Sequence, residues 1–145
     1  MTLQQFLFSF RGRVNRAKYW LFVLCSIIAV GAVILVVYPL MGSIAYVAIV
    51  GAAYLLLIYT SIAVAVKRLH DRDKSAWWLL VFYGAPLAVT AVAMALRLDE
   101  MISTIATMLI MIWAFVEFGC LRGTAGPNKY GADPLQEPQP WLRYH

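Results

Sequence analysis

The chain has 145 residues, of which 63% are hydrophobic and 13% are charged, and its net charge is +5. A soluble domain usually carries roughly 45–50% apolar and about 25% charged residues, so the composition excludes an ordinary water-soluble domain. The basic residues gather where long apolar blocks end, which favours an anionic membrane surface over nucleic acid as the partner.

The first ten residues carry an apolar pattern that is typical of a helix lying on a membrane. Leu3, Phe6, Leu7 and Phe10 recur at the i, i+3, i+4 and i+7 positions of one helical face. We therefore predict a short helix that lies flat in the interface. The alternative is a start without fixed structure.

Four apolar segments follow, and each is long enough to cross the bilayer as a helix, which takes about 20 residues. Open strands would leave backbone groups unpaired in lipid, so the predicted fold is a small all-α bundle of about four transmembrane helices. The segments comprise residues 19–41, 44–66, 77–96 and 101–121. The first is too long for the apolar region of a cleaved signal peptide, so we expect it to be retained. Gly84 and Pro86 interrupt the third segment.

The domain organisation is predicted to be simple. Residues 1–134 form a single transmembrane domain, and residues 135–145 form a flexible tail in which Pro138 and Pro140 stand beside glutamines. No internal repeat is evident.

The distribution of lysine and arginine predicts the orientation, because cytoplasmic loops keep an excess of both. Eleven of these side chains flank the segments on one side, and Arg97 stands alone on the other. Both termini and the middle loop are therefore predicted to be cytoplasmic. The eleven are Arg11, Arg13, Arg16, Lys18, Lys67, Arg68, Arg72, Lys74, Arg122, Lys129 and Arg143.

The first polar cluster occupies residues 10–20. Asn15 is suited to cap the first spanning helix, and Tyr19 and Trp20 are suited to anchor it in the interface. The arginines, among them Arg13 and Arg16, have two interpretations. They hold an anionic headgroup, or they are ordinary anchors that fix the topology.

The second cluster, residues 67–78, is the most concentrated polar sequence in the chain. A His70–Asp71 pair beside Arg68 suggests acid–base chemistry, but a catalytic site also needs a nucleophile or a metal, and the sequence offers neither. A structural group of salt bridges and helix caps is the favoured interpretation. Trp77 and Trp78 then enter the interface as further anchors.

The third cluster, residues 122–134, contains Asn128, Lys129, Tyr130 and Asp133 among glycines and prolines. This composition predicts tight turns and an ordered loop that folds back on the protein. Nucleotide binding is not expected, because the P-loop spacing and its Lys-Ser/Thr ending are absent.

Glu117 is the only ionisable residue inside a predicted span. It lies about one turn from the basic side, where a partner such as Arg68 or Arg122 is within reach. The alternative is a role in transport or proton relay, because charged residues inside a membrane are costly and often functional.

The two cysteines and two histidines do not suggest a cofactor. Cys25 and Cys120 are interpreted as small buried hydrophobes, because a disulfide is not expected near a reducing cytoplasm. His70 and His145 do not have the spacing of a zinc site, so we expect no metal and no cofactor.

In these three clusters the sequence resembles the small bacterial inner-membrane proteins typified by YhaH and YhaI, a family of unknown function. Three ordered family motifs have counterparts at residues 12–20, 68–78 and 123–134. Many members have glycine at the position of Asp73. The resemblance implies a bacterial inner-membrane location and a shared site or shared packing cluster on the cytoplasmic face, but no reaction.

Together these patterns predict a non-enzymatic membrane module whose polar motifs converge on one site for an anionic lipid headgroup or a partner protein, which includes a second copy of this chain in a homo-oligomer. The alternative is a small oligomeric transporter or channel that uses Glu117 and the Gly84/Pro86 break. The predicted site comprises Arg13, Arg16, Arg68, His70, Asp71, Asn128, Lys129, Tyr130 and Asp133.

Overall fold

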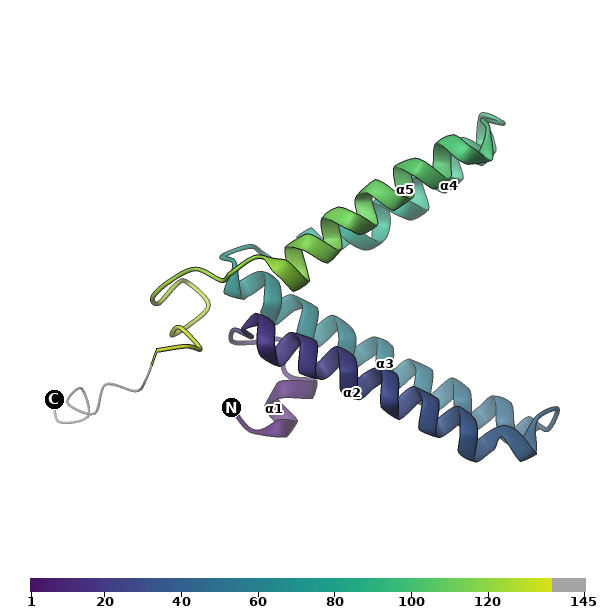
Figure 1. Ribbon diagram of the computed structural model, residues 1–145, viewed down its shortest axis with the longest axis horizontal. Helices are drawn as coiled ribbons and strands as arrows, with labels where there is room; N and C mark the ends of the chain where they lie inside the picture. The colour runs from purple at the N-terminus through teal and green to yellow at the C-terminus, as the bar shows by residue number, and fades with distance from the viewer. Residues whose placement is uncertain (137–145) are drawn as a thin grey trace, which may run out of the picture.

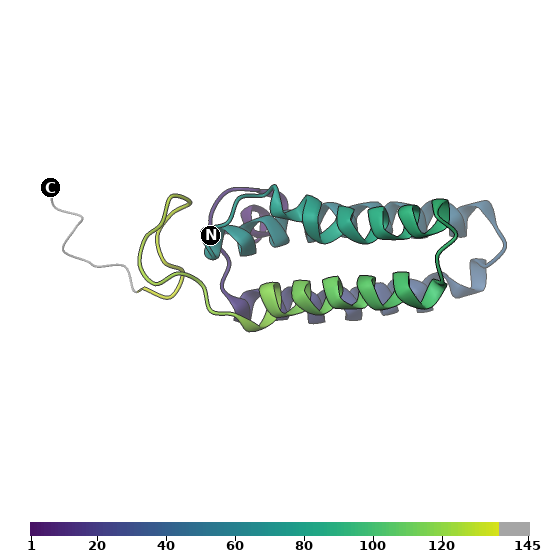
Figure 2. The same ribbon diagram turned by 90° about the horizontal axis from the view of Figure 1, so that it is seen from above.

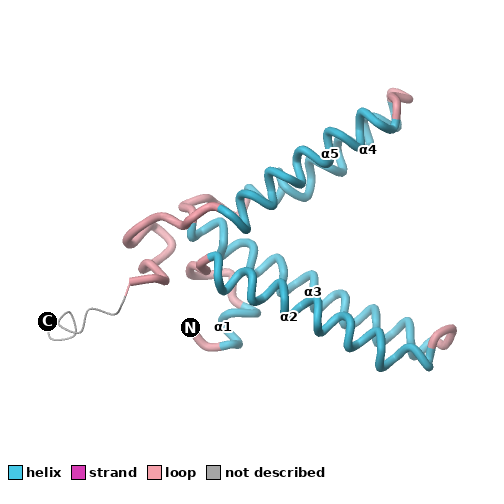
Figure 3. Tube along the Cα trace, viewed as in Figure 1, coloured by secondary structure: helices cyan, strands magenta, loops and turns pink. Residues whose placement is uncertain are grey.

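The structure, a computed structural model, describes residues 1–136 and is built from helices joined by loops (Figure 3). Residues 137–145 of the predicted tail lie outside the described residues. The elements are α1 (Leu3–Phe8), α2 (Arg16–Val37), the 3-10 turn η1 (Tyr38–Leu40), α3 (Ile44–Asp71), the π-helical turn η2 (Leu80–Gly84), α4 (Ala85–Ala95), α5 (Glu100–Phe115) and the π-helical turn η3 (Val116–Cys120).

The predicted all-α membrane fold is confirmed. The helical stretches Arg16–Leu40, Ile44–Asp71 and Glu100–Cys120 are long and apolar enough to cross a bilayer, whereas Leu80–Ala95 is a shorter apolar helix. The shorter helix runs antiparallel to α5 and carries the chain to the end of the molecule where α5 begins (Figure 1). Three to four helices therefore have the character of membrane spans.

The helices form two hairpins that meet at one end and diverge toward the other (Figure 1). α2 pairs with α3, and α4 pairs with α5. Among the described elements the hairpin backbones approach each other where η3 contacts α2 and α3, and α1 lies against α3. Side chains add two contacts there, because Phe82 of η2 joins the α3 core residues and the Trp20 ring lies 5.7 Å from the Phe115 ring. We call this meeting point the basic end; it comprises residues 1–20, 65–78 and 117–136. Figure 2 shows that both the N-terminus and the loop after α5 lie there.

Most of the apolar surface is not covered by protein. In the most apolar windows of the three long helices only 6%, 17% and 11% of residues are buried inside the chain. Water around so much exposed apolar surface would be unfavourable, at about 25 cal/mol per Å², so lipid tails must supply the missing contacts. Cys25 and Cys120 are both exposed, and their predicted burial is wrong because the two hairpins enclose so little interior.

The small hydrophobic core lies next to the basic end, where the hairpins meet. Ala65, Leu69, Phe82 and Phe118 bring together residues from α3, η2 and η3. Tyr19 stacks on Phe118, with ring centroids 6.1 Å apart. The core thus fixes both hairpins at the level where the polar motifs gather.

The start of the chain is largely as predicted. Asn15 caps α2, because its side-chain oxygen accepts a hydrogen bond from the Lys18 N–H at 2.9 Å. The predicted N-terminal helix is present as α1. It ends at Phe8, however, so Phe10 does not share its face. The extended backbone of Ser9 and the positive φ of Gly12 (+96°) turn the chain away from the helix.

The predicted break at Gly84 and Pro86 is not a break. The π-helical turn η2 leads directly into α4, with Pro86 in its first turn. A proline ring clashes with the carbonyl four residues earlier in an α-helix, and the wider π turn relieves that clash without unwinding the chain.

Candidate functional site

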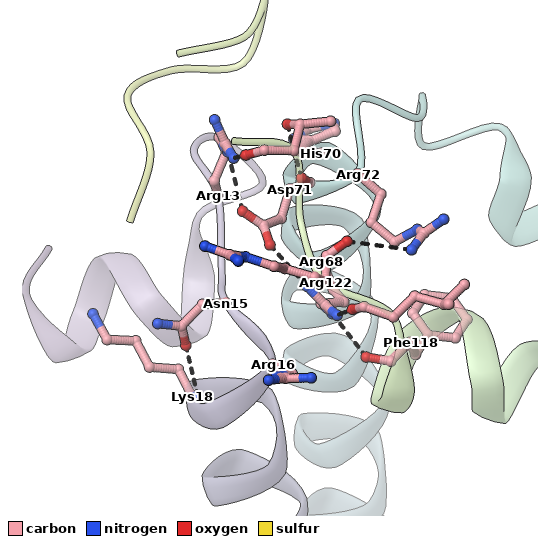
Figure 4. Close-up of polar contacts among 12 residues, drawn as sticks. Arg13, Asn15, Arg16, Lys18, Arg68, His70, Asp71, Arg72, Phe118 and Arg122 are labelled. Atoms are coloured by element: carbon pink, nitrogen blue, oxygen red, sulfur yellow. Dashed lines mark hydrogen bonds and ion pairs between the residues drawn. The ribbon is translucent and has the colours of Figure 1, made fainter. Parts of the chain in front are cut away.

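Asp71, the last residue of α3, lies at the centre of the basic end. Its Oδ1 accepts a hydrogen bond from Arg13 Nε at 3.1 Å, and its Oδ2 accepts one from Arg68 Nη1 at 2.7 Å (Figure 4). All three residues are buried, with exposed fractions of 2% for Asp71, 6% for Arg13 and 0% for Arg68. Two of the three predicted clusters therefore meet at one carboxylate.

The remaining donors of the two arginines bind backbone carbonyls in the last part of the chain. Arg13 donates to the carbonyls of Thr124 and Gly126, at 2.6 and 2.7 Å. Arg68 donates to the carbonyls of Phe118, at 2.7 Å, and Leu121. Because buried charges are tolerated only when they are paired and hydrogen-bonded, these contacts make the buried cluster possible.

The loop after η3 folds back over the end of α3, as its glycines and prolines predicted. Thr124 donates its N–H to the Asp71 carbonyl at 2.8 Å, and Asn128 donates its side-chain N–H to the His70 carbonyl at 2.9 Å. Gly126 and Gly131 adopt positive φ values of +77° and +138°, which glycine tolerates. The loop thereby covers the carbonyls at the end of α3.

His70 and Tyr130 join the same loop to α3 through their rings. The rings are parallel within 6°, with centroids 3.8 Å apart, and His70 Nδ1 lies 3.3 Å from the Gly12 carbonyl. His70 therefore contacts Tyr130 and the N-terminal segment, while its neighbour Asp71 holds the arginines. The two residues act separately, so the structure gives no support to a catalytic His70–Asp71 pair.

The carbonyls at the end of η3 are bound by side chains from the other hairpin. Trp20 Nε1 donates to Gly119 at 3.0 Å, and Arg16 lies 3.4 Å from the Cys120 carbonyl. Helix C-termini leave four carbonyls without partners inside the helix, and arginine is well placed to satisfy them. A Cβ on Gly119 would lie only 2.6 Å from the Trp20 ring, so this close approach requires glycine.

Glu117 is buried and paired, but its partners differ from those predicted. Arg72 Nε lies 2.6 Å and Lys74 Nζ 2.7 Å from Glu117 Oε1. Arg68 is instead bound to Asp71, and the Arg122 side chain has no ion pair within residues 1–136. A carboxylate held by two cations is a structural contact, so Glu117 no longer favours a transport role, and neither does the unbroken helix at Pro86.

Several predicted residues lie at the edge of the cluster rather than within it. Lys129 has a 59% exposed side chain and is 3.7 Å from Asp73, so it is a surface residue. Asp73 has a φ of +56°, a left-handed value that explains why glycine is suited to this position. Trp20 and Trp77 expose large parts of their side chains to the surroundings, as expected of interfacial anchors. Trp78 is half-buried and packs on the core.

Lys67 is a member of the cluster that the sequence interpretation missed. It is fully buried, and its Nζ donates to the carbonyls of Gln5, at 3.1 Å, and Phe6. Its own carbonyl accepts a hydrogen bond from the Val14 N–H at 3.1 Å. Lys67 precedes Asp71 by four residues, a spacing that places both on one helical face. That spacing is the feature of the sequence from which its place in the cluster could have been predicted.

Arg16 and Arg122 are the basic residues beside the cluster that form no ion pair within residues 1–136. They line a polar cavity of about 270 Å³ together with Asn15, Thr124 and Asp133, beside Asp71. Arg122 donates no side-chain hydrogen bond within the described residues, and Arg16 makes only the 3.4 Å contact to Cys120. Figure 4 shows that Arg16 and Lys18 point to different sides of α2.

The fold and the site define a multi-pass membrane protein whose two apolar hairpins are joined at one end by a buried arginine–aspartate cluster. The chain belongs to the family of proteins of unknown function DUF805, whose model matches residues 7–132. No solved structure matches it.

Three relatives from Escherichia coli K12 cover most of the chain. The uncharacterized protein YiiR is 34% identical over 92% of this chain and 90% of its own length. The inner membrane protein YhaI is 32% identical over 86% and 85%, and the inner membrane protein YhaH is 33% identical over 89% of each. With the apolar helices, these names support an inner-membrane location.

Proposed function

We propose that this protein is a non-catalytic membrane module whose basic end binds the anionic phosphate of a phospholipid headgroup. The observation that carries the proposal is the cavity between Arg16 and Arg122, whose guanidinium groups are not saturated by residues 1–136. Arginine presents several donors in a planar fork that matches the oxygens of a phosphate.

The position of the cavity, at the junction between apolar helices and polar loops, supports a lipid ligand. Arg16 is the first residue of α2, and Arg122 is the second residue after η3, so both stand where an apolar helix meets its polar loop. Trp20, one turn from Arg16, is partly exposed in the manner of an interfacial anchor. Phosphate groups of a bilayer occupy this same level, and basic residues near it are attracted by about 1 kcal/mol each.

The buried cluster has a different role in this proposal. Arg13 and Arg68 donate hydrogen bonds to Asp71 and to backbone carbonyls, so we assign them to the shape of the cavity and not to ligand binding. The predicted headgroup site is thus narrowed to Arg16 and Arg122, with Asn15 and Thr124 as neutral neighbours.

The proposal is tested by counting phospholipids retained on the gently purified protein by native mass spectrometry. We expect the double variant Arg16→Gln/Arg122→Gln to lose about tenfold or more in phospholipid occupancy, which corresponds to about 1.4 kcal/mol. Lys18→Gln is the matched control, because Lys18 is exposed on the same turn of α2 but does not line the cavity.

Unchanged phospholipid retention by a folded double variant would contradict the proposal. If the same substitutions instead removed a copurifying protein, the cavity would belong to a protein interface. The thermal unfolding temperature of each variant shows whether loss of the Arg16–Cys120 contact has disturbed the fold.

A further inference from the structure

The polar cavity contains charges of both signs that do not pair with each other. Arg16 and Arg122 line it together with Asp133, yet none of the ion pairs in the described part of the chain joins Asp133 to either arginine. Asp71 also borders the cavity, but Arg13 and Arg68 already compensate its charge. The cavity therefore contains two cations and a carboxylate that forms no ion pair within residues 1–136, although the nearby charges of Arg13 and Arg122 also help to lower the pKa of Asp133.

The Asp133 carboxylate is held in place by the loop. Its Oδ2 accepts the Gly126 N–H and its Oδ1 accepts the Leu135 N–H, both at 2.9 Å. These two backbone donors lower the pKa of Asp133 below its ordinary value, with Leu135 the larger cause. Its ionised form is present at neutral pH, and the loop contacts that favour it weaken only as the pH falls through that lowered pKa.

We infer that the cavity recognises a zwitterionic aminophospholipid headgroup of the phosphoethanolamine type, with the phosphate at Arg16 and Arg122 and the primary ammonium at Asp133. This inference rests on the proposed function and specifies its ligand. A primary ammonium offers three N–H donors, and each carboxylate oxygen keeps acceptor capacity after it has accepted one backbone N–H. The cavity, at about 270 Å³, suits a compact headgroup.

Other common headgroups do not offer Asp133 a cationic N–H donor. A phosphoglycerol headgroup has no cation, so Asp133 would face a second negative charge across the cavity. A phosphocholine headgroup carries a positive charge but no N–H, so it cannot donate a hydrogen bond to Asp133. The arrangement therefore distinguishes headgroups by their amine, whereas the arginines respond to the phosphate that all of them share.

The first experiment needs no substitution. Wild-type protein in nanodiscs is offered equal fractions of phosphatidylethanolamine, its N,N-dimethyl derivative, phosphatidylcholine and phosphatidylglycerol, and the bound lipid is counted by native mass spectrometry. We expect occupancy to fall in steps as the ammonium loses its N–H groups, reaching about a tenfold loss at phosphatidylcholine. Equal occupancy by all four lipids would overturn the inference.

The second experiment tests the assigned residue. Asp133→Asn keeps an oxygen acceptor for the loop but removes the charge, so we expect the preference for phosphatidylethanolamine over phosphatidylglycerol to disappear. Asp73→Asn is the matched control, because Asp73 is exposed at the same end and does not line the cavity. A retained preference in Asp133→Asn would overturn the assignment.

The two proposals fail in different ways. If Arg16→Gln/Arg122→Gln reduces every phospholipid equally while the methylation series is flat, the phosphate site stands and the amine preference does not. If the arginine variant changes nothing, both fail. Binding of soluble O-phosphoethanolamine as tight as that of the lipid would overturn the lipid assignment and point to a water-soluble phosphoamine.

Discussion

The buried residues Arg13, Arg68 and Asp71 form a cluster of charges at the basic end. Removing Arg13, Arg68 and Asp71 from water is unfavourable, and a buried ion pair seldom adds much net stability. Such a cluster does penalise every arrangement in which one member loses its partner, by about 3–5 kcal/mol. The cluster therefore specifies how the N-terminal segment, the end of α3 and the final loop fit together.

Gly123 provides the sharpest test of that fit. A Cβ at this position would overlap the Asp71 carboxylate and lie 2.9 Å from the Asp71 carbonyl oxygen. We expect Gly123→Ala to destabilise the protein by about 1–3 kcal/mol, the usual result of overpacking. The measurement is the thermal unfolding temperature in detergent, followed by tryptophan fluorescence.

Gly51→Ala is the control for this substitution. Gly51 lies within α3, and a Cβ added there would meet nothing within 4 Å, so alanine is expected to be neutral or to stabilise the helix by up to about 1 kcal/mol. Equal unfolding temperatures for the wild type and Gly123→Ala would show that the final loop is not packed against Asp71.

The π-helical turn η3 positions the end of the last helix against the other hairpin. It ends the helix with its carbonyls directed at donors from the other hairpin, among them Trp20 and Arg68. The same turn contains Glu117, which binds two cations from the loop after α3. One short element thus accepts donors through both its backbone carbonyls and its carboxylate, and π turns are often found at functional sites.

The Glu117 contact is tested by Glu117→Gln. The substitution leaves Arg72 and Lys74 without their counterion, but both are partly exposed, at 19% and 25%, and are able to recover water. We therefore expect a loss of about 1–2 kcal/mol in unfolding free energy, below the range for a fully buried pair. Urea unfolding in mixed micelles measures it.

Lys129→Gln serves as the comparison, because its contact with Asp73 is long and exposed. Surface pairs of this kind contribute little, and a change below about 0.5 kcal/mol is expected. A Glu117→Gln variant as stable as Lys129→Gln would contradict the structural role assigned to Glu117.

The whole molecule is a pair of apolar hairpins fastened at one end (Figure 1). Away from the basic end the two hairpins diverge, so lipid has access to the apolar surface of each of them. This asymmetry matches the charge distribution, because ten of the eleven lysines and arginines in residues 1–136 belong to the basic end. The positive-inside rule predicts that this side faces the cytoplasm.

That orientation is tested by cysteine labelling in whole cells, in a background in which Cys25 and Cys120 are replaced by alanine. Glu100→Cys, at the first residue of α5, is expected to react with a membrane-impermeant maleimide. Asp73→Cys is expected to react only after the cells are opened. The reverse pattern would place the basic end in the periplasm.

The amino-acid sequence is enough to predict that lipid surrounds this protein and where along the chain its helices lie. Long apolar blocks specify helices in lipid, because a bilayer satisfies no backbone hydrogen bonds, and the three polar motifs indicate where the helices end. Asn15 as a helix cap and the ordered loop at residues 122–134 follow from local chemistry, since each depends on neighbours a few residues away.

The packing of the hairpins alone decides which charged side chains are paired inside the protein and which are left to bind a ligand. Arg13 and Arg16 stand three residues apart and look equivalent in the sequence, yet Arg13 is buried against Asp71 while Arg16 lines the cavity. Partners such as Arg72 for Glu117, and the burial of Lys67, depend on contacts between residues about 45–60 positions apart. Such pairings are set by how the hairpins pack, because the local sequence supplies charges without specifying which distant group will meet them.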